Sequence, residues 1–318
     1  MTDPFIPPPR TGRQHALAVV QALLVTFLWS TSWVLIKVGL DDLDLAPISF
    51  AGLRYALAAA ILLPFGIQAM RSAHATRPIG RPLLERVAIY GLLFVAVAQG
   101  AQFAALAVLP ATAVSLVLAS IPAVVAVMAL AGQHERASVW QGVGIGLLSL
   151  GAVLYFGPFE VEPGAAIGFV AAGVCVLAAA TSSHLGRGLA RDAAARLGGA
   201  LGLTASSMAV GGVALLVVGV ALEGWPRLDA IGWLIVAWLA LVNTAFAFTL
   251  WNHTLRTLTA VESSVVNNTM TIQIAVLAVI FLGERLDPIQ LVGLLLAASG
   301  AALVQVAPFL RRRSRGKN

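Results

Sequence analysis

Long apolar runs separated by short polar stretches recur along the whole chain of 318 residues. A helix needs about 20 predominantly apolar residues to cross the hydrocarbon core of a bilayer. The pattern predicts an all-α integral membrane protein with ten transmembrane helices. We place them at residues 14–38, 46–69, 86–107, 111–131, 138–156, 164–186, 199–222, 229–251, 261–282 and 289–309.

Composition supports the bilayer as the solvent of this chain. Hydrophobic residues make up 59% of it and charged residues 11%, too few charges for the surface of a soluble domain of this size. The single cysteine, Cys175, excludes an internal disulfide and argues against a thiolate metal site. We expect no metal and no cofactor. Residues 1–13 form a polar, proline-rich tail, and the apolar run after them exceeds a signal-peptide core, so it is interpreted as a retained first span.

The basic residues are distributed unequally between the two sides of the predicted membrane. Sixteen of the 20 Lys and Arg fall on the side that holds both termini. Arg227 and Arg285 fall on the other side, while Lys37 and Arg54 lie inside spans. The positive-inside rule then predicts cytoplasmic termini in the cell inner membrane. The basic tail, 310–318, is expected to contact anionic lipid, and nucleic acid is not an expected partner.

The two halves of the chain repeat each other. A shift of 149 residues aligns 109–154 with 258–303 without a gap, and 16 of the 46 positions are identical. The identities include Ser115 with Ser264 and two pairs of glycines, Gly144 with Gly293 and Gly151 with Gly300. An odd number of spans per half inverts the second half, which predicts a pseudo-two-fold axis in the membrane plane and a binding site near the midplane. The predicted repeats are residues 14–156 and 164–309.

Several motifs now resemble a known family. They are Trp29-Ser-Thr-Ser-Trp33 followed by Lys37 in the first span, Arg54 in the second, and Gly283-Glu284-Arg285 after the ninth. Together with ten spans in two halves, the chain resembles the drug/metabolite transporter superfamily, and within it the EamA-type exporters. The resemblance covers residues 14–309 and implies export of small metabolites, often amino acids, through a cavity between the halves. One position departs from it: Pro122 is the expected proline of the fourth span, but its counterpart in the ninth is Thr271, so symmetric kinking is not expected.

The ninth span carries the clearest polar stripe. Ser264, Asn267, Asn268 and Thr271 lie within about 100° of one another on a helix that turns about 100° per residue. Polar groups are costly in lipid, so they should face a cavity or a protein partner. Two adjacent amides favour a cavity wall that binds substrate. The alternative is hydrogen bonding between helices that holds the bundle together.

Lys37 and Arg54 are the two cations inside spans. They are candidates for binding a carboxylate or phosphate of a substrate, and a guanidinium binds such groups in a bidentate manner. In the alternative interpretation Lys37 extends to the outer surface, and Arg54 pairs with Asp41, Asp44 or Glu284.

Further candidate substrate-binding residues are Ser30, Trp33, Gln99, Gln102, Ser115, Asn243 and Trp251. Ser30, Trp33 and Lys37 share one face of the first span by their spacing, while Trp251 is equally compatible with an anchor at the membrane interface. Glu262 is a candidate for coupling protons to transport, although a glutamate at a helix start is also explained by the helix dipole.

These patterns predict a secondary active transporter that exports a small polar metabolite, an amino acid or a related compound, by alternating access. The expected partners are this substrate, membrane lipid and a proton or counter-substrate, and no enzymatic activity is expected. A membrane-embedded lipid-modifying enzyme is the rival, resting on the cluster Asp41-Asp42-Leu43-Asp44. A passive channel is a third interpretation, weakened by the lack of a charged ring.

Overall fold

A computed structural model describes residues 12–72, 80–131, 139–157 and 164–315. Within these ranges the chain forms helices joined by short turns, and it contains no strand. Ten helices or helix groups are long and apolar enough to cross a membrane. In chain order the helices are α1 (Gly12–Asp41), α2 (Pro47–Ser72), α3 (Arg81–Gly91), η1 (Leu92–Val97), α4 (Ala98–Leu106), α5 (Ala111–Leu118), α6 (Ile121–Ala131), α7 (Val139–Phe156), α8 (Ala165–Arg196), α9 (Ala200–Glu223), α10 (Ala230–Ala240), η2 (Leu241–Phe246), α11 (Ala247–Thr254), α12 (Ala260–Phe281) and α13 (Pro288–Arg315).

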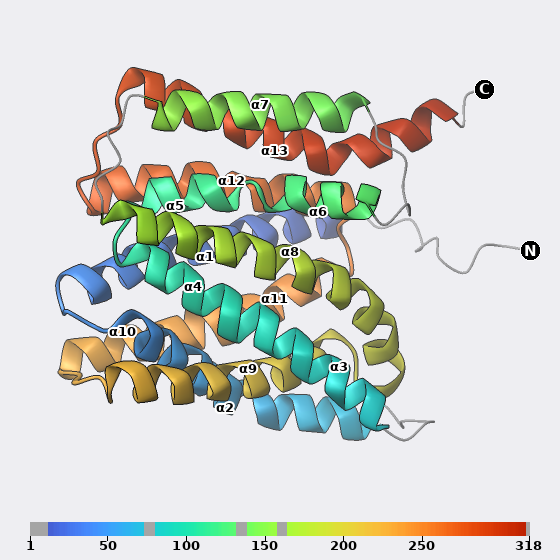
Figure 1. The fold of residues 1–318 in the computed structure, drawn as a ribbon. Helices are drawn as coiled ribbons and strands as arrows, with labels where there is room; N and C mark the ends of the chain where they lie inside the picture. Colours follow the sequence, from blue (N-terminus) through green and yellow to red (C-terminus); the bar gives the residue numbers. More distant parts are fainter. Residues whose placement is uncertain (1–11, 73–79, 132–138, 158–163, 316–318) are drawn as a thin grey trace, which may run out of the picture.

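The predicted fold of ten transmembrane helices is confirmed. Figure 1 shows that α1 begins and α13 ends on the same side of the bundle. We call this side the terminus face, and the opposite side, which holds the turns after α1, α4, α9 and α12, the loop face. The third span consists of α3, η1 and α4, the fourth of α5 and α6, and the eighth of α10, η2 and α11.

The inverted repeat extends into the third and eighth spans. Each is interrupted by a π-helical segment of six residues, Leu92–Val97 and Leu241–Phe246. The two segments are separated by the same 149 residues that align the later spans of the two halves. A π segment carries one extra residue per turn and often marks a functional position. Its occurrence at one offset in both halves shows that they share backbone irregularities as well as sequence.

The glycines shared by the two halves pack against each other across the repeat. α7 and α13 lie side by side at one edge of the bundle, and α2 and α9 lie at the opposite edge (Figure 1). A Cβ atom on Gly144 would lie 2.8 Å from the carbonyl oxygen of Gly300, and one on Gly151 would lie 2.5 Å from that of Gly293. Gly144 thus contacts Gly300, the repeat equivalent of Gly151, and Gly151 contacts Gly293, the repeat equivalent of Gly144. A two-fold axis between α7 and α13 requires this exchange.

The fourth and ninth spans differ, as the Pro122 and Thr271 positions predict. The fourth span breaks at Ala119 and Ser120, just before Pro122, whereas α12 is continuous through Thr271. Proline lacks an amide hydrogen and its ring clashes with the preceding turn, so a helix bends or breaks there. The first repeat therefore carries a joint that the second repeat lacks.

The helices α8 and α13 extend farthest past the ends of the predicted spans. α8 continues to Arg196, about ten residues past the predicted end at 186, so Arg187 and Arg196, which the sequence places in a loop, lie on a helix. α13 continues to Arg315. Hydropathy reports where a helix leaves the hydrocarbon and not where it ends, which explains both differences.

Candidate functional site

Aromatic side chains form a row across the interface between the two repeats. The ring centroid of Trp29 on α1 lies 5.2 Å from that of Phe248 and 5.3 Å from that of Trp251, both on α11. Phe248 lies 6.5 Å from Phe94 on η1, and Phe94 stacks on Tyr90 at 5.5 Å. We call these five side chains the aromatic row. It connects helices of the first repeat with α11 of the second.

Buried polar atoms without a partner accompany the aromatic row. Within the described part of the chain, Trp29 Nε1, Asn243 Oδ1, Asn252 Nδ2 and Asn268 Nδ2 are buried and form no hydrogen bond. Trp29 belongs to the row, Asn252 follows Trp251, and the Asn243 amide donates to the carbonyl of Leu28, next to Trp29. A buried polar group without a partner costs free energy unless water or a ligand satisfies it. The atoms therefore offer hydrogen bonds to a bound molecule.

The interior face of α12 is buried toward the loop face and exposed at Asn267. Asn267, Thr271, Ile274 and Ala278 follow the spacing of one helix face. Thr271, Ile274 and Ala278 are at most 7% exposed, whereas Asn267, one turn nearer the terminus face than Thr271, is exposed, and Ser263 one turn farther on is buried at 8%. Asn267 is thus an exposed position between buried positions on this side of α12.

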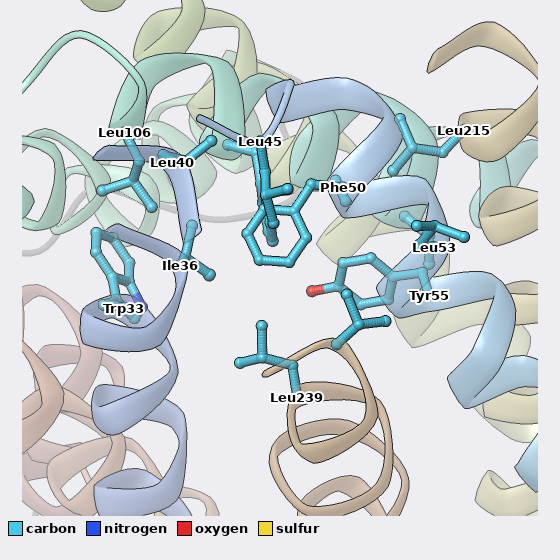
Figure 2. Packing of buried hydrophobic residues seen from close by; sticks show 14 of the residues in the cluster. Trp33, Ile36, Leu40, Leu45, Phe50, Leu53, Tyr55, Leu106, Leu215 and Leu239 are labelled. Atoms are coloured by element: carbon cyan, nitrogen blue, oxygen red, sulfur yellow. The ribbon is translucent and has the colours of Figure 1, made fainter. Parts of the chain in front are cut away.

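An apolar plug closes the loop-facing half of the bundle. Figure 2 shows Trp33 and Ile36 on one side and Phe50 and Tyr55 on the other, with Leu239 between them. Ile36, Phe50 and Leu239 are fully buried, and Phe50 packs edge-on against Phe103 with a centroid distance of 5.3 Å. Trp33, a predicted substrate-binding residue, is 6% exposed and belongs to this plug in the observed conformation.

Ser30 and Asn243 join α1 to the second repeat. Ser30 Oγ donates to Oε1 of Gln273 at 2.9 Å, and Gln273 Nε2 donates to Thr26 Oγ1 at 3.3 Å and to Thr269 Oγ1 at 3.0 Å. Asn243, in η2, also donates to Thr31 Oγ1 at 3.2 Å. The structure thus brings Ser30 and Asn243 to the same interface as the aromatic row, on opposite sides of α1.

The remaining predicted polar residues lie at different depths. Gln99 accepts a hydrogen bond of 2.7 Å from the Tyr55 hydroxyl, between α4 and α2. Gln102 is buried on α4, and Ser115 is buried and donates to the backbone carbonyl of Thr112 at 2.8 Å. Ser264 is half-buried on α12, on the same face as Asn268. Gln99 is the one of these that shares a bond with the helix carrying Arg54.

Glu262 caps the start of α12. Its carboxylate accepts from the backbone nitrogen of Thr259 at 2.8 Å, and the Thr259 hydroxyl accepts from the Glu262 backbone nitrogen at 3.3 Å, which is a capping box. His15 Nε2 lies 3.1 Å from the same carboxylate. These contacts satisfy the amides of the first turn of α12 and support the structural interpretation of Glu262 over proton coupling.

Lys37 lies at a polar pocket on the loop face. Its ammonium group lies 2.8 Å from the Asp41 carboxylate and donates to the Leu106 carbonyl at 3.0 Å. The pocket has a volume of about 430 Å³ and is also lined by Asp42 and Glu284. Lys37 therefore has an intramolecular counter-ion, which fits the interpretation that it extends toward the surface.

Glu284 connects the turn after α12 to the start of α5. Its carboxylate accepts from the backbone nitrogen of Ala111 at 2.6 Å and from the Thr112 hydroxyl at 2.5 Å. Glu223 does the same at α2, accepting from the backbone nitrogen of Ser49 at 2.7 Å. A carboxylate at a helix N-terminus satisfies free amides and interacts favourably with the helix dipole. Both carboxylates thus fasten one repeat to the other at the loop face.

Replacing Glu284 by Ala is expected to lower the free energy of unfolding by about 2 kcal/mol, because hydrogen bonds to a charged acceptor are lost and the start of α5 is left uncapped. Thermal unfolding in detergent measures this. Glu85→Ala is the control, since Glu85 forms an exposed pair with Arg81 and such pairs contribute little. Equal stability of the two variants would contradict the assigned role of Glu284.

Comparison with known proteins decides the family. The sequence model of the EamA-like transporter family matches the chain twice, at residues 16–157 and 166–306, which together make up most of the chain. The chain belongs to the EamA-like transporter family. The two matched segments agree with the inverted repeat, and the resemblance to this family seen in the sequence is confirmed. It is a multi-pass membrane transporter.

A solved structure shares the EamA-like fold of this chain. It is described only as the crystal structure of a protein, is 20% identical in sequence, and superposes with a TM-score of 0.62 over 95% of this chain and 99% of its own. No curated protein sequence matches the chain.

Several residues of the site are not among the sequence-based candidates. Phe94 and Phe248 are indistinguishable in sequence from the many phenylalanines that face lipid, so only the packing shows their role. Trp29 belongs to the motif that carries the family resemblance. Gln273 and Asn252 are amides in apolar surroundings, and the rule that singled out Asn243 and Asn268 also applies to them.

Proposed function

We propose that this EamA-like protein exports a small polar metabolite, an amino acid or a related compound, by alternating access, with the substrate bound at the aromatic row. The observation that carries the proposal is the unpartnered buried nitrogen of Trp29 within the row, together with unpartnered buried amide atoms on Asn243, which bonds to the residue before Trp29, and on Asn252, which follows Trp251. Aromatic faces bind the apolar part of a substrate, and the amides orient its polar groups.

The distribution of positive charge supports an orientation of the protein in the membrane. The terminus face holds the basic loops and is taken as cytoplasmic. The plug at Ile36, Phe50 and Leu239 buries the interior on the loop-facing side, and the proposal assigns this conformation to the state that loads substrate from the cytoplasm. In the alternate conformation the two repeats exchange roles, the plug opens, and the substrate leaves at the loop face of the inner membrane.

The rival interpretation as a lipid-modifying enzyme rests on the acidic cluster after α1. Asp41 in that cluster is ion-paired with Lys37. Metal-dependent phosphate chemistry needs several free carboxylates that converge on one point. Among the described residues, no group of three or more His, Cys, Asp or Glu side chains converges in this way, so no observation favours an enzyme.

A test of the proposed function begins with metabolite profiling. Strains that overproduce the protein are expected to accumulate its substrate in the medium, and deletion strains to retain it. Purified protein in proteoliposomes should then show saturable uptake of that compound, accelerated by the same compound inside the vesicles, as a carrier does. Linear uptake without acceleration would indicate a channel, and magnesium-dependent conversion of lipid would indicate an enzyme.

A further inference from the structure

Arg54 is a buried cation without a counter-ion among the described residues. Its side chain lies inside the second span and the residue is 4% exposed. The guanidinium Nε donates to Thr244 Oγ1 at 3.0 Å, and the guanidinium carbon lies 5.0 Å from the ring centroid of Tyr55 and 6.0 Å from that of Phe103. One hydroxyl and two aromatic faces satisfy a small part of a guanidinium with five donor hydrogens.

None of the carboxylates that the sequence proposed as partners of Arg54 pairs with it. Asp41 pairs with Lys37, and Glu284 caps α5. Asp44 is exposed in the turn between α1 and α2. Glu223, on the neighbouring helix α9, caps α2. The structure therefore does not support the interpretation of Arg54 as one half of a structural ion pair.

Arg54 contacts the π-helical segment η2, which lies next to the aromatic row. Thr244, its acceptor, lies in η2, and the adjacent Asn243 bonds to the Leu28 carbonyl, one residue before Trp29. Tyr55, the neighbour of Arg54, donates to Gln99. The guanidinium thus lies against the plug residue Tyr55 and beside η2, at the level of the middle of the eighth span.

An uncompensated charge in the interior of a membrane protein is costly, and charged residues in such positions commonly bind an ion or substrate. We propose that Arg54 binds an anionic group of the transported molecule, a carboxylate or a group of equivalent charge, while the aromatic row receives its apolar body. This inference rests on the proposed function and narrows its substrate class to organic acids, including amino acids. Compounds that carry no anionic group are not expected to be substrates.

The probe pair for this inference is benzoate and benzamide, which have the same shape and differ in charge. Benzoate is expected to raise the Tm of the purified wild-type protein in a saturable manner, and benzamide is not. In Arg54→Met the benzoate response is lost. Arg86→Met is the control, because Arg86 forms a partly exposed pair with Asp192, and its benzoate response should equal that of the wild type.

Stability without ligand separates a binding role from a structural one. Because Met removes an unpaired buried charge and keeps a long side chain, the Tm of Arg54→Met is expected to equal or exceed that of the wild type. A Tm well below that of the wild type would overturn the proposal, and so would equal responses of the wild type to benzoate and benzamide. The wild-type comparison requires no variant and stands even where the variant fails to fold.

Transport measurements distinguish this inference from the proposed function. Proteoliposomes are tested with amino acids and with the matching amino acid amides. The acids are expected to be carried about tenfold to hundredfold faster, since one charge-assisted contact is lost with the amide. Equal rates would overturn the role of Arg54 and leave the transporter intact. An Arg54-dependent benzoate response without any counterflow would overturn the proposed transport and leave the anion site intact.

Discussion

Replacing Asn267 and Asn268 together by Leu is expected to lower flux at least about tenfold while membrane insertion and folding stay normal. Asn268 Nδ2 is buried without a partner and Asn267 is exposed on the interior side of α12. Neither amide forms a side-chain hydrogen bond to another described residue. The substitution is therefore expected to weaken substrate binding and to leave the fold unchanged. Counterflow in proteoliposomes measures flux, and thermal unfolding measures the fold.

The matched control for this variant changes exposed apolar positions outside the polar stripe on the same helix. Val265 and Ile272 are 47% and 41% exposed on α12, and the double variant Val265→Leu, Ile272→Leu introduces two leucines there. Its flux should equal that of the wild type. Normal flux from a well-folded Asn267, Asn268 variant would remove the ninth span from the substrate site and restore the alternative that its amides serve only to hold helices together.

Gly151→Ala is expected to lower the free energy of unfolding by about 1 to 3 kcal/mol, the usual range for overpacking a close contact. The added Cβ atom would lie 2.5 Å from both the backbone nitrogen of Ala297 and the carbonyl oxygen of Gly293. Backbone atoms cannot rotate away, so α7 and α13 must separate. Gly300→Ala should cost a similar amount, because its Cβ atom would lie 2.5 Å from the Gly144 carbonyl oxygen on the symmetric side of the contact.

Gly146 supplies the control for the packing prediction on the same helix. A Cβ atom there meets no other atom within 4 Å, and alanine favours the helix over glycine by about 1 kcal/mol. Gly146→Ala should therefore be neutral or slightly stabilising in thermal unfolding. If Gly146→Ala and Gly151→Ala unfold alike, the two-fold contact between α7 and α13 does not hold the repeats together as described.

The sequence predicts the spans because the bilayer imposes a length on each apolar run. The starts and ends of α2 and α12 agree with the predicted spans to within three residues. The π segments were not predictable, since Leu92–Val97 is uniformly apolar and differs in no visible way from an α-helical stretch. An extra residue in a turn is selected by contacts with neighbouring helices, which one sequence does not show.

The candidate site was predicted in its polar part and in Trp251 of the aromatic row. Asn243 and Asn268 stand out because amides are rare in apolar runs, and the structure places Asn243 against α1 and leaves Asn268 Nδ2 without a partner. Phe94 and Phe248 could not be identified from the sequence, because a phenylalanine side chain is equally suited to face lipid or to contact a substrate. The pairing of Lys37 with Asp41 depends on the geometry of one helix turn, so both interpretations of Lys37 were open until that geometry was known.

The break before Pro122 has no equivalent in α12. It affects the equilibrium between the two orientations that the proposed alternating-access mechanism gives the unloaded protein. Two identical repeats would make its inward and outward orientations equal in energy, and the unloaded protein would populate each half of the time. A joint in one repeat removes this degeneracy, because straightening or bending it changes the energy of one orientation only. Under the proposed alternating access, the unloaded protein is therefore expected to prefer one orientation.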